Sequence, residues 1–563
     1  MRSLLRLLPV VAILASTACR DSSTTAGDSA NADATAGGTL VLASAGDADN
    51  LLPGMSTAIT SQQVVDLVFD RLAEIGGDLS VVGDAGFKPQ LARRWTWAAD
   101  SLSIAFELDP RARWHDGRPV RASDVRFSYS LYRDPSLASQ VAPNIASIDS
   151  VTVRDSLTVV AWYAKRSPQQ FFDAVHHALI VPEHVYGTGP LSQLRGSDRS
   201  RNPVGSGRFR FVRWDAGSRI ELVSDTANYR GRALLDRVIW TLAADPAGAL
   251  ARIVAGEADF FEAVPADRAP AIDSLPSIRV FAYPGSGYAF MGMNSRDGRG
   301  SSAPHRVFGD VRVRRALTMA TNRPALLENV FGGYGLPAYG PFPASMAISD
   351  TTIPQLPFDT LAARALLDSA GWQVGAGGIR QKDGRPLRFS LLAPQSSAPR
   401  MAYAVLLQAQ FRRVGADVRL ETVDFPTSVT RSRDRDYDAA LQAWGTGPGP
   451  GAFRGRWGSE TAMTGDNLEG YRNPAMDVLV DSALASYDPE RTKSLMRRAY
   501  ELIIADAPAI WLYDLVPVAA AHERLRIPAF RADKWWVHLA DWYIPEGERI
   551  ERDRIGLRAA PVP

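Results

Sequence analysis

The sequence predicts a protein of the α/β class with two or three domains and mixed sheets. The chain has 563 residues, 46% of them hydrophobic, which is more than one ordinary domain needs to fill its core. Segments that alternate like strands, such as 101–108, are interleaved with segments whose apolar residues recur at helical spacing. Strands and helices that alternate over this length are typical of α/β domains.

The expected strands are short apolar or alternating segments. The first is Thr39 to Ala43, and from Ser101 to Leu108 every second residue is apolar, which indicates a half-buried strand. Similar strands are expected at 157–162, 220–223, 238–242, 389–392 and 418–423. The apolar stretch 503–521 is broken by acidic residues and prolines, so it predicts a buried helix, a turn and a strand.

Three helices carry clear start or stop signals. Asp310 is a good N-cap for a helix through Arg323, and Asp359 caps another helix that ends at Gly371. A third helix is expected over 401–414, with Gly415 as its stop. In the first helix we expect an inward stripe at helical spacing and three outward arginines, and an anion site made by those arginines is the alternative. The stripe is Val313, Ala316, Leu317 and Ala320, and the arginines are Arg312, Arg314 and Arg315.

The N-terminus predicts export. Residues 1–19 combine two arginines, an apolar run from Leu7 to Ala15 and small residues before Cys19, the only cysteine of the chain. We interpret them as a lipoprotein signal peptide with Cys19 as the lipid acceptor, and the alternative is ordinary cleavage after Ala18. Either way we expect the protein in the periplasm or on the outer face of the cell membrane, without disulfides. Residues 20–38 lack apolar surface and predict a disordered tether.

Composition and motifs argue against several classes of function. Lys+Arg 63 against Asp+Glu 61 leaves a formal charge of +2, with no basic run suited to nucleic acid. Glycine patterns of α/β-hydrolases and phosphate-binding loops are absent from the sequence, and Gly445–Gly451 is interrupted by prolines that remove amide donors and block a following helix. The seven histidines show no convincing metal spacing. We therefore expect no catalytic residues, no cofactor and no metal site.

Several segments, in order along nearly the whole chain, are similar to the family 5 extracellular solute-binding proteins. That family includes dipeptide-, oligopeptide- and nickel-binding components of ABC importers. The segments are Gly38–Val41 with Asp49–Pro53; Pro89–Trp95, Phe106–Leu108, Trp114–Gly117 and Ser123–Ser128; Pro203–Phe209 with Asn228–Gly231; Gly256–Asp259; Asp310–Leu317 with Ala320–Arg323; and Ala365–Trp372.

The resemblance implies a periplasmic-binding-protein-like fold of two lobes that close at a hinge. Lobe I would comprise 39–86, 202–284 and 511–563, with an extra subdomain, 87–201, inserted in it. Lobe II would comprise 285–510. The ligand would lie where the lobes meet.

One departure from the family bears on the ligand. In the peptide binders an aspartate shortly after a tryptophan pairs with the peptide's α-ammonium, and here Gly447 stands at the matching place after Trp444. A buried ammonium without a carboxylate partner is heavily penalised. Either another acid replaces the aspartate, with Asp436, Asp438 and Asp466 nearby in sequence, or the ligand has no free amino terminus.

The expected ligand-binding residues surround this tryptophan. Trp444, Gly445 and Thr446, with the glycine-rich loop that follows, should line the cleft, because glycine permits close approach and tryptophan offers a large rigid face. The alternative is that Trp444 only packs beneath a loop. Tyr288, Trp457 and Tyr471 are further candidates.

These expectations combine into one functional hypothesis. The protein would be a monomeric, lipid-anchored binding protein that captures a peptide or related small solute by hinge closure. It would deliver the solute to the permease and ATPase complex of an ABC importer. The alternative is a sensing or chaperone lipoprotein of the same fold without its own importer, and an enzyme built on this fold is a third possibility.

Overall fold

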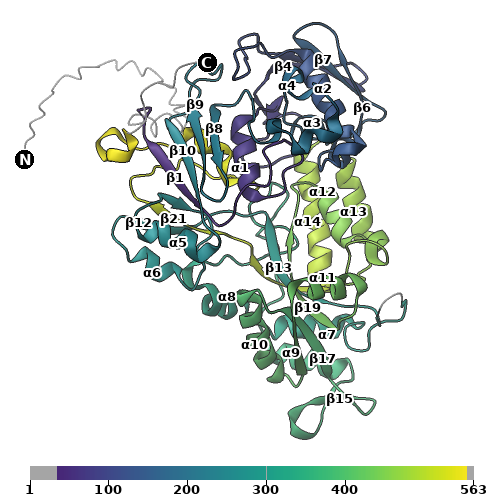
Figure 1. The fold of residues 1–563 in the computed structure, drawn as a ribbon. Coiled ribbons are helices and arrows are strands. Elements are labelled where there is room, and N and C mark those ends of the chain that lie inside the picture. Colours follow the sequence, from purple (N-terminus) through teal and green to yellow (C-terminus); the bar gives the residue numbers. More distant parts are fainter. Residues whose placement is uncertain (1–34, 299–300, 555–563) are drawn as a thin grey trace, which may run out of the picture.

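The computed structural model describes residues 35–298 and 301–554, and it has the predicted mixed α/β architecture. The predicted signal peptide, Cys19 and the tether up to residue 34 lie outside the described residues. Figure 1 shows an upper lobe that contains β1 and β8–β10 and a lower lobe that contains β13, β17 and β19. Among the described helices, none is both long and apolar enough to cross a membrane.

The larger sheet belongs to the upper lobe and mixes parallel and antiparallel pairs. Its central strand β1 pairs in parallel with β10 and β11, whereas β9 and β21 join antiparallel. In spatial order its described strands are β12 (Ile278–Ala282), β21 (Val518–His522), β11 (Phe260–Phe261), β1 (Thr39–Ser44), β10 (Arg237–Leu242), β9 (Arg219–Ser224) and β8 (Phe209–Asp215). Helices α1 (Ile59–Val68), α5 (Pro246–Val254) and α6 (Ala269–Asp273) belong to this lobe.

An antiparallel sheet lies within the expected insertion, 87–201. Its described strands, in spatial order, are β4 (Ala92–Trp97), β5 (Ser103–Leu108), β7 (Thr158–Tyr163) and β6 (Ile148–Val153). Ile104, Phe106 and Leu108 are buried as the alternation predicts. The accompanying helices are α2 (Ala122–Arg133), α3 (Gln170–Val175) and α4 (Glu183–Tyr186), and β2 (Ala73–Glu74) with β3 (Lys88–Pro89) joins the insertion to the lobe.

The smaller sheet is the core of the lower lobe. In spatial order its described strands are β18 (Asp417–Val423), β17 (Arg388–Pro394), β19 (Ala439–Gly445), β13 (Gly287–Met293) and β20 (Ala509–Asp514). One face is covered by α7 (Val311–Met319), α8 (Arg323–Phe331), α9 (Thr360–Ser369) and α10 (Ala398–Arg412). The remaining elements of this lobe are α11 (Phe425–Asp434), α12 (Pro450–Trp457), α13 (Pro474–Leu484), α14 (Pro489–Asp506) and the small strands β14 (Gln373–Val374), β15 (Arg380–Lys382) and β16 (Arg385–Pro386).

Two chain segments connect the sheets. The first runs from β12 to β13, and the second consists of the three residues Leu515–Pro517 between β20 and β21. The boundary expected at 511 falls inside β20, which pairs with β13 in the smaller sheet. The chain therefore returns to the upper lobe only after Asp514, because the buried run 509–514 completes the lower sheet before it crosses.

Helix α7 has the predicted inward stripe, but two of its three arginines turn toward the protein, since Arg314 is buried and the half-buried Arg315 donates to the Ala505 carbonyl. Asp310 accepts a hydrogen bond from the Arg312 amide as N-cap, and the four stripe residues are at most 1% exposed. The helix ends at Met319, earlier than expected, and α8 starts at Arg323. Arg314 is buried, contrary to the prediction, because its guanidinium donates to the carbonyls of Phe308 and Asp506. It thereby satisfies a carbonyl at the C-terminus of α14, where a cation is favourable.

The other two predicted helices stop before the expected glycines, although α10 begins at Ala398 and ends at Arg412, earlier at both ends than expected. Asp359 accepts bonds from the amides of Leu361 and Ala362, and Gly371 has a φ of +88°, as a glycine after a helix C-terminus does. Helix α10 is followed by Gly415 with a φ of +90°. Both glycines adopt a left-handed conformation that other residues rarely reach.

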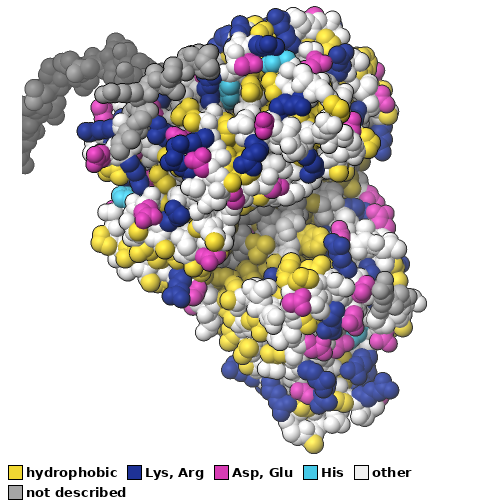
Figure 2. Space-filling view, viewed as in Figure 1, with side chains coloured by type: hydrophobic (Ala, Val, Ile, Leu, Met, Phe, Trp, Pro, Cys, Tyr) yellow, Lys and Arg dark blue, Asp and Glu magenta, His cyan; other side chains and the backbone are white. Residues whose placement is uncertain are grey.

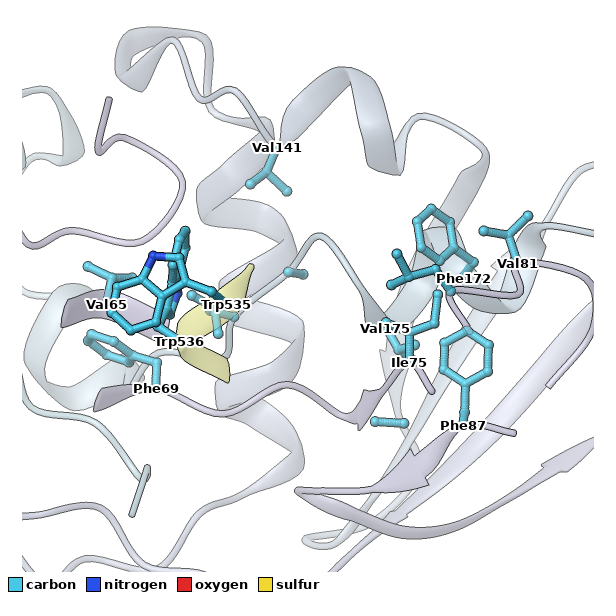
Figure 3. Close-up of a cluster of buried hydrophobic side chains, with 14 of the residues drawn as sticks. Val65, Phe69, Ile75, Val81, Phe87, Val141, Phe172, Val175, Trp535 and Trp536 are labelled. Carbon is cyan, nitrogen blue, oxygen red and sulfur yellow. The ribbon is translucent and has the colours of Figure 1, made fainter. Parts of the chain in front are cut away.

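One continuous core joins the upper lobe, its insertion and part of the lower lobe. Figure 3 shows a section of it, in which Trp535 and Trp536 from the C-terminal region lie against Val65 and Phe69, while Phe172 and Phe87 lie further along. A second core lies between the smaller sheet and the helices α7–α10 that cover one of its faces. The interface between the lobes is therefore well packed on the side of α12 and α14, whose Trp457 and Tyr500 belong to the first core.

Candidate functional site

The molecule is hollowed between its two lobes (Figure 2). The segment after α8 bridges the two lobes, because the Ala347 amide donates to the Asp78 carbonyl of the upper lobe at 3.1 Å. The Thr446 amide donates at 2.8 Å to the carbonyl of Ser286, which lies in the first connection between the sheets. The end of β19 thus lies at the junction of the lobes.

Trp444 stands near the end of β19 and is half-buried. Its partner on β13 is Tyr288, whose partner on β20 is Asp514, so these three residues form one row across the sheet. Directly paired residues point to the same face of a sheet. The next row on that face is Gln442, Phe290 and Trp511.

The outer edge of β19 is open beside Trp444. Strand β17 pairs with β19 only at Ala439 and Ala440, and no other described strand pairs with β19 on that side beyond Ala440. A strand edge with free amide and carbonyl groups can bind an extended chain by adding it to the sheet. This edge is a candidate backbone-binding surface.

A pocket of about 260 Å³ opens along this edge. It combines apolar and charged walls, since Phe425 is 50% exposed and the Arg400 guanidinium lies 5.8 Å from its ring centroid. Burial lowers the pKa of Arg400, which indicates that its charge is incompletely solvated. The lining residues used below are Arg400, Phe425, Gln442, Trp444 and Asp466.

A buried ion pair lies behind Trp444. Arg456 donates to both carboxylate oxygens of Glu469, at 2.7 and 3.0 Å, and the two side chains are 2% and 0% exposed. Gln442 donates to the same carboxylate at 3.0 Å. Burial by itself would lower the pKa of Arg456, but the charge of Glu469 outweighs it and the pKa lies above its usual value. The guanidinium of Arg456 is therefore held charged inside the protein.

Aromatic rings surround the guanidinium of Arg456. Its carbon lies 4.3 Å from the ring centroid of Trp457, 4.9 Å from that of Trp444 and 5.3 Å from that of Phe290. The Trp457 indole N–H donates to the Tyr288 hydroxyl at 3.0 Å. Tyr288 and Trp457 are only 1% and 0% exposed, so they support Trp444 from behind.

The remaining predicted site residues lie partly in the loop after β19 and partly in the core. Gly445 and Gly447 are exposed and Thr446 is half-buried in the loop after β19. Tyr471 is buried and donates to the Asp506 carboxylate at 2.8 Å, beneath α14. The prolines of the loop do not prevent a following helix, contrary to expectation, because α12 begins at Pro450, where a proline lacks no needed donor.

The three acids considered as replacements at Gly447 have different surroundings. Asp438 is engaged by His305 at 2.9 Å and by the Ser390 amide at 2.7 Å. Asp436 is exposed and pairs with Arg431. Asp466 is exposed on the wall of the Trp444 pocket, so it is the acid of the three nearest to a ligand at this pocket.

Sequence reasoning missed Arg456, Glu469, Gln442 and Arg400. Isolated charged or polar residues carry no signal of burial by themselves. One signal exists in Gly292 on β13, since a Cβ there would lie 2.3 Å from a carboxylate oxygen of Glu469. A glycine inside a strand indicates close approach of another group.

Comparisons with known proteins agree with this architecture. The model of a family described as bacterial extracellular solute-binding proteins, family 5 middle, matches residues 86–465. The oligopeptide-binding protein AppA of Bacillus subtilis is 26% identical over 514 residues, covering 89% of this chain and 92% of AppA. The glutathione-binding protein GsiB of Pectobacterium atrosepticum is 25% identical over 444 residues, covering 77% of this chain and 82% of GsiB.

Solved structures show the same fold. The structure of Bacillus subtilis AppA in complex with a nonapeptide matches with a TM-score of 0.67 at 25% identity, covering 91% of this chain and 99% of AppA. The ABC transporter substrate-binding protein CtaP from Listeria monocytogenes matches with a TM-score of 0.76 at 20% identity, covering 91% of this chain and all of CtaP.

Proposed function

Because this chain belongs to family 5 of the bacterial extracellular solute-binding proteins, we propose that it binds a peptide or related small solute between its lobes and delivers it to an ABC importer. The names of its relatives support a peptide-like ligand, since AppA binds oligopeptides and GsiB binds glutathione. We further propose that Cys19 carries a lipid anchor that holds the protein outside the cytoplasm.

The open edge of β19 is the observation that carries this proposal. It offers backbone groups from Leu441 onward to an extended ligand, next to the half-buried ring of Trp444. Main-chain bonds to a strand edge give affinity for peptides of many sequences, and neighbouring pockets select among side chains. The pocket beside Arg400 and Phe425 would receive one such side chain or terminus.

The glycine at position 447 narrows the class of peptide that the site is proposed to bind. No carboxylate stands there to receive an α-ammonium, so the proposal predicts that free-amino peptides bind more weakly than N-acetylated ones. Closure over the ligand would shift the population of open and closed lobes by contacts made only in the closed state.

Calorimetric titration of the purified protein with di-, tri- and tetrapeptides, each with a free and an acetylated N-terminus, tests the proposal. We expect binding of several peptides and a loss of at least tenfold in affinity on Trp444→Ala, which removes the contact face. Trp162→Ala is the matched control, because that indole is 43% exposed on the insertion and donates to Thr152 there.

Two results would contradict parts of this proposal. Absence of binding across the whole panel would reject a peptide ligand. Submicromolar binding that acetylation abolishes would show that another acid, for which Asp466 is the first candidate, receives the ammonium.

A further inference from the structure

The half-buried Trp444 has an ion pair behind it where an apolar core would suffice. Arg456 and Glu469 are at most 2% exposed, and Arg456 lies between the rings of Trp444, Trp457 and Phe290. Replacing a buried ion pair by apolar residues is often neutral or stabilising, so such a pair is weak grounds for fold stability. An ion pair at this place therefore points to a different role.

The geometry of the guanidinium suits orientation of rings. Arginine is planar and stacks on aromatic faces, while its donors fix it to a carboxylate in two directions. Here Glu469 holds two nitrogens of Arg456, and Gln442, on the same face of the sheet as Trp444, is bonded to the same carboxylate. The indole of Trp444 is thereby held against a group that cannot itself rotate.

Trp444 has little other support on its outer side. Beyond Ala440 no described strand covers the outer edge of β19, and the indole borders the pocket of about 260 Å³. An aromatic ring at such an edge can change its side-chain rotamer unless its inner face is fixed. A ring ordered in advance binds a ligand without a further cost of ordering.

We propose that Arg456, held by Glu469, is a positioning residue that fixes the Trp444 ring for ligand binding. The part concerning ligand rests on the proposed function, whereas the part concerning the ring does not. Arg456 acts through Trp444, and Tyr288 and Trp457 complete the support on the inner side.

The test uses the full chain labelled with 5-fluorotryptophan and observed by fluorine NMR. The resonance of Trp444 among the 13 tryptophans is assigned with Trp444→Phe. Arg456→Lys keeps a cation for Glu469 but removes the planar stacking group. We expect this variant to remain folded with a similar Tm, while the Trp444 resonance shifts or splits and its solvent isotope shift increases.

Arg454→Lys is the matched control. Arg454 lies two residues earlier in α12, and its guanidinium pairs with Asp477 at 3.0 Å and Asp481 at 2.8 Å, away from the rings. The control should leave the Trp444 resonance unchanged. An unchanged Trp444 resonance in Arg456→Lys would overturn the proposal.

Titration separates the two parts of the inference. With the tightest-binding peptide of the panel described above, Arg456→Lys should raise the Kd about tenfold and Arg454→Lys less than twofold. A shifted resonance with unchanged Kd would overturn the role in binding, and would do so without contradicting peptide binding itself.

Discussion

Two buried arginines, one in each lobe, use the same chemistry for different ends. In the upper lobe Arg524 pairs with Asp259 and Asp553, and all three side chains are at most 3% exposed. These aspartates also accept the amides of Val41 and Thr39, so the cluster ties β1 to segments far away in the chain. In the lower lobe Arg456 has a single carboxylate partner, and its remaining neighbours include three aromatic rings.

The partners of Arg524 and Arg456 show what each buried arginine holds in place. Arg524 also donates to the Thr39 carbonyl, and that hydrogen bond would be lost with the guanidinium. Buried backbone groups without partners are costly, so this cluster has a structural role. The neighbours of Arg456 include side chains near a ligand surface, which fits a positioning role.

The largest expected effect comes from breaking the cluster of the upper lobe. Arg524→Met should lower the free energy of unfolding by about 5 kcal/mol, because Asp553 loses its cation while it stays buried. Urea denaturation measures the loss, and hydrogen exchange should show reduced protection of β1.

Arg526→Met is the control for that experiment. Its pair with Glu548 is 39% and 41% exposed, so its loss should cost less than about 1 kcal/mol. Equal effects of the two variants would show that burial of the cluster carries no stability.

Asp514 sharpens the comparison because it is a buried carboxyl without a cation partner among the described residues. One of its oxygens accepts the Ala344 amide at 2.9 Å and the other has no partner in the described structure. Burial raises its pKa from 3.8 to about 7. The native state therefore holds a proton that the unfolded state releases between those two values, and stability falls as the pH rises through this range.

The expected loss between about pH 4 and pH 7 is about 4 kcal/mol, since each pKa unit corresponds to about 1.4 kcal/mol. Asp514→Asn should flatten this part of the stability profile, measured by urea denaturation at a series of pH values. Asp436→Asn, at an exposed carboxylate, should leave the slope as it is. A slope that persists in Asp514→Asn would assign it to other groups.

The smallest effect on the free energy of unfolding is expected when Arg456 and Glu469 of the lower lobe are replaced together. Arg456→Met alone leaves Glu469 buried and unpaired and should cost about 3 kcal/mol. The double variant Arg456→Met with Glu469→Leu should return to within about 1 kcal/mol of the original protein. Denaturation of the single and double variants decides this, and a double variant as unstable as the single one would give Arg456 the structural role of Arg524.

Local patterns predicted much of the fold. The stripe of α7, the caps Asp310 and Asp359 and the alternation of β5 depend on neighbours within a few residues, and the structure confirms them. The inward turn of Arg314 could not be predicted, because its acceptor is the carbonyl of Asp506 at the end of a distant helix. The lobe boundary at 511 was misplaced for a similar reason, because the sequence of a buried strand does not show to which of the two sheets the strand belongs.

The candidate site, too, was predictable from the sequence only in part. Trp444, the glycine-rich loop after it and the departure at Gly447 are visible in the sequence, as are the motifs that place the chain in its family. Tyr288 and Trp457 were expected as candidate ligand-binding residues, but both are buried. Their contact joins residues 169 positions apart, and only packing shows that they lie behind Trp444. Periodicity and capping are short-range effects and can be read from the chain itself. Which charges are buried together, and which ring they hold, is decided by the tertiary structure, because burial and pairing depend on groups brought together from separate segments.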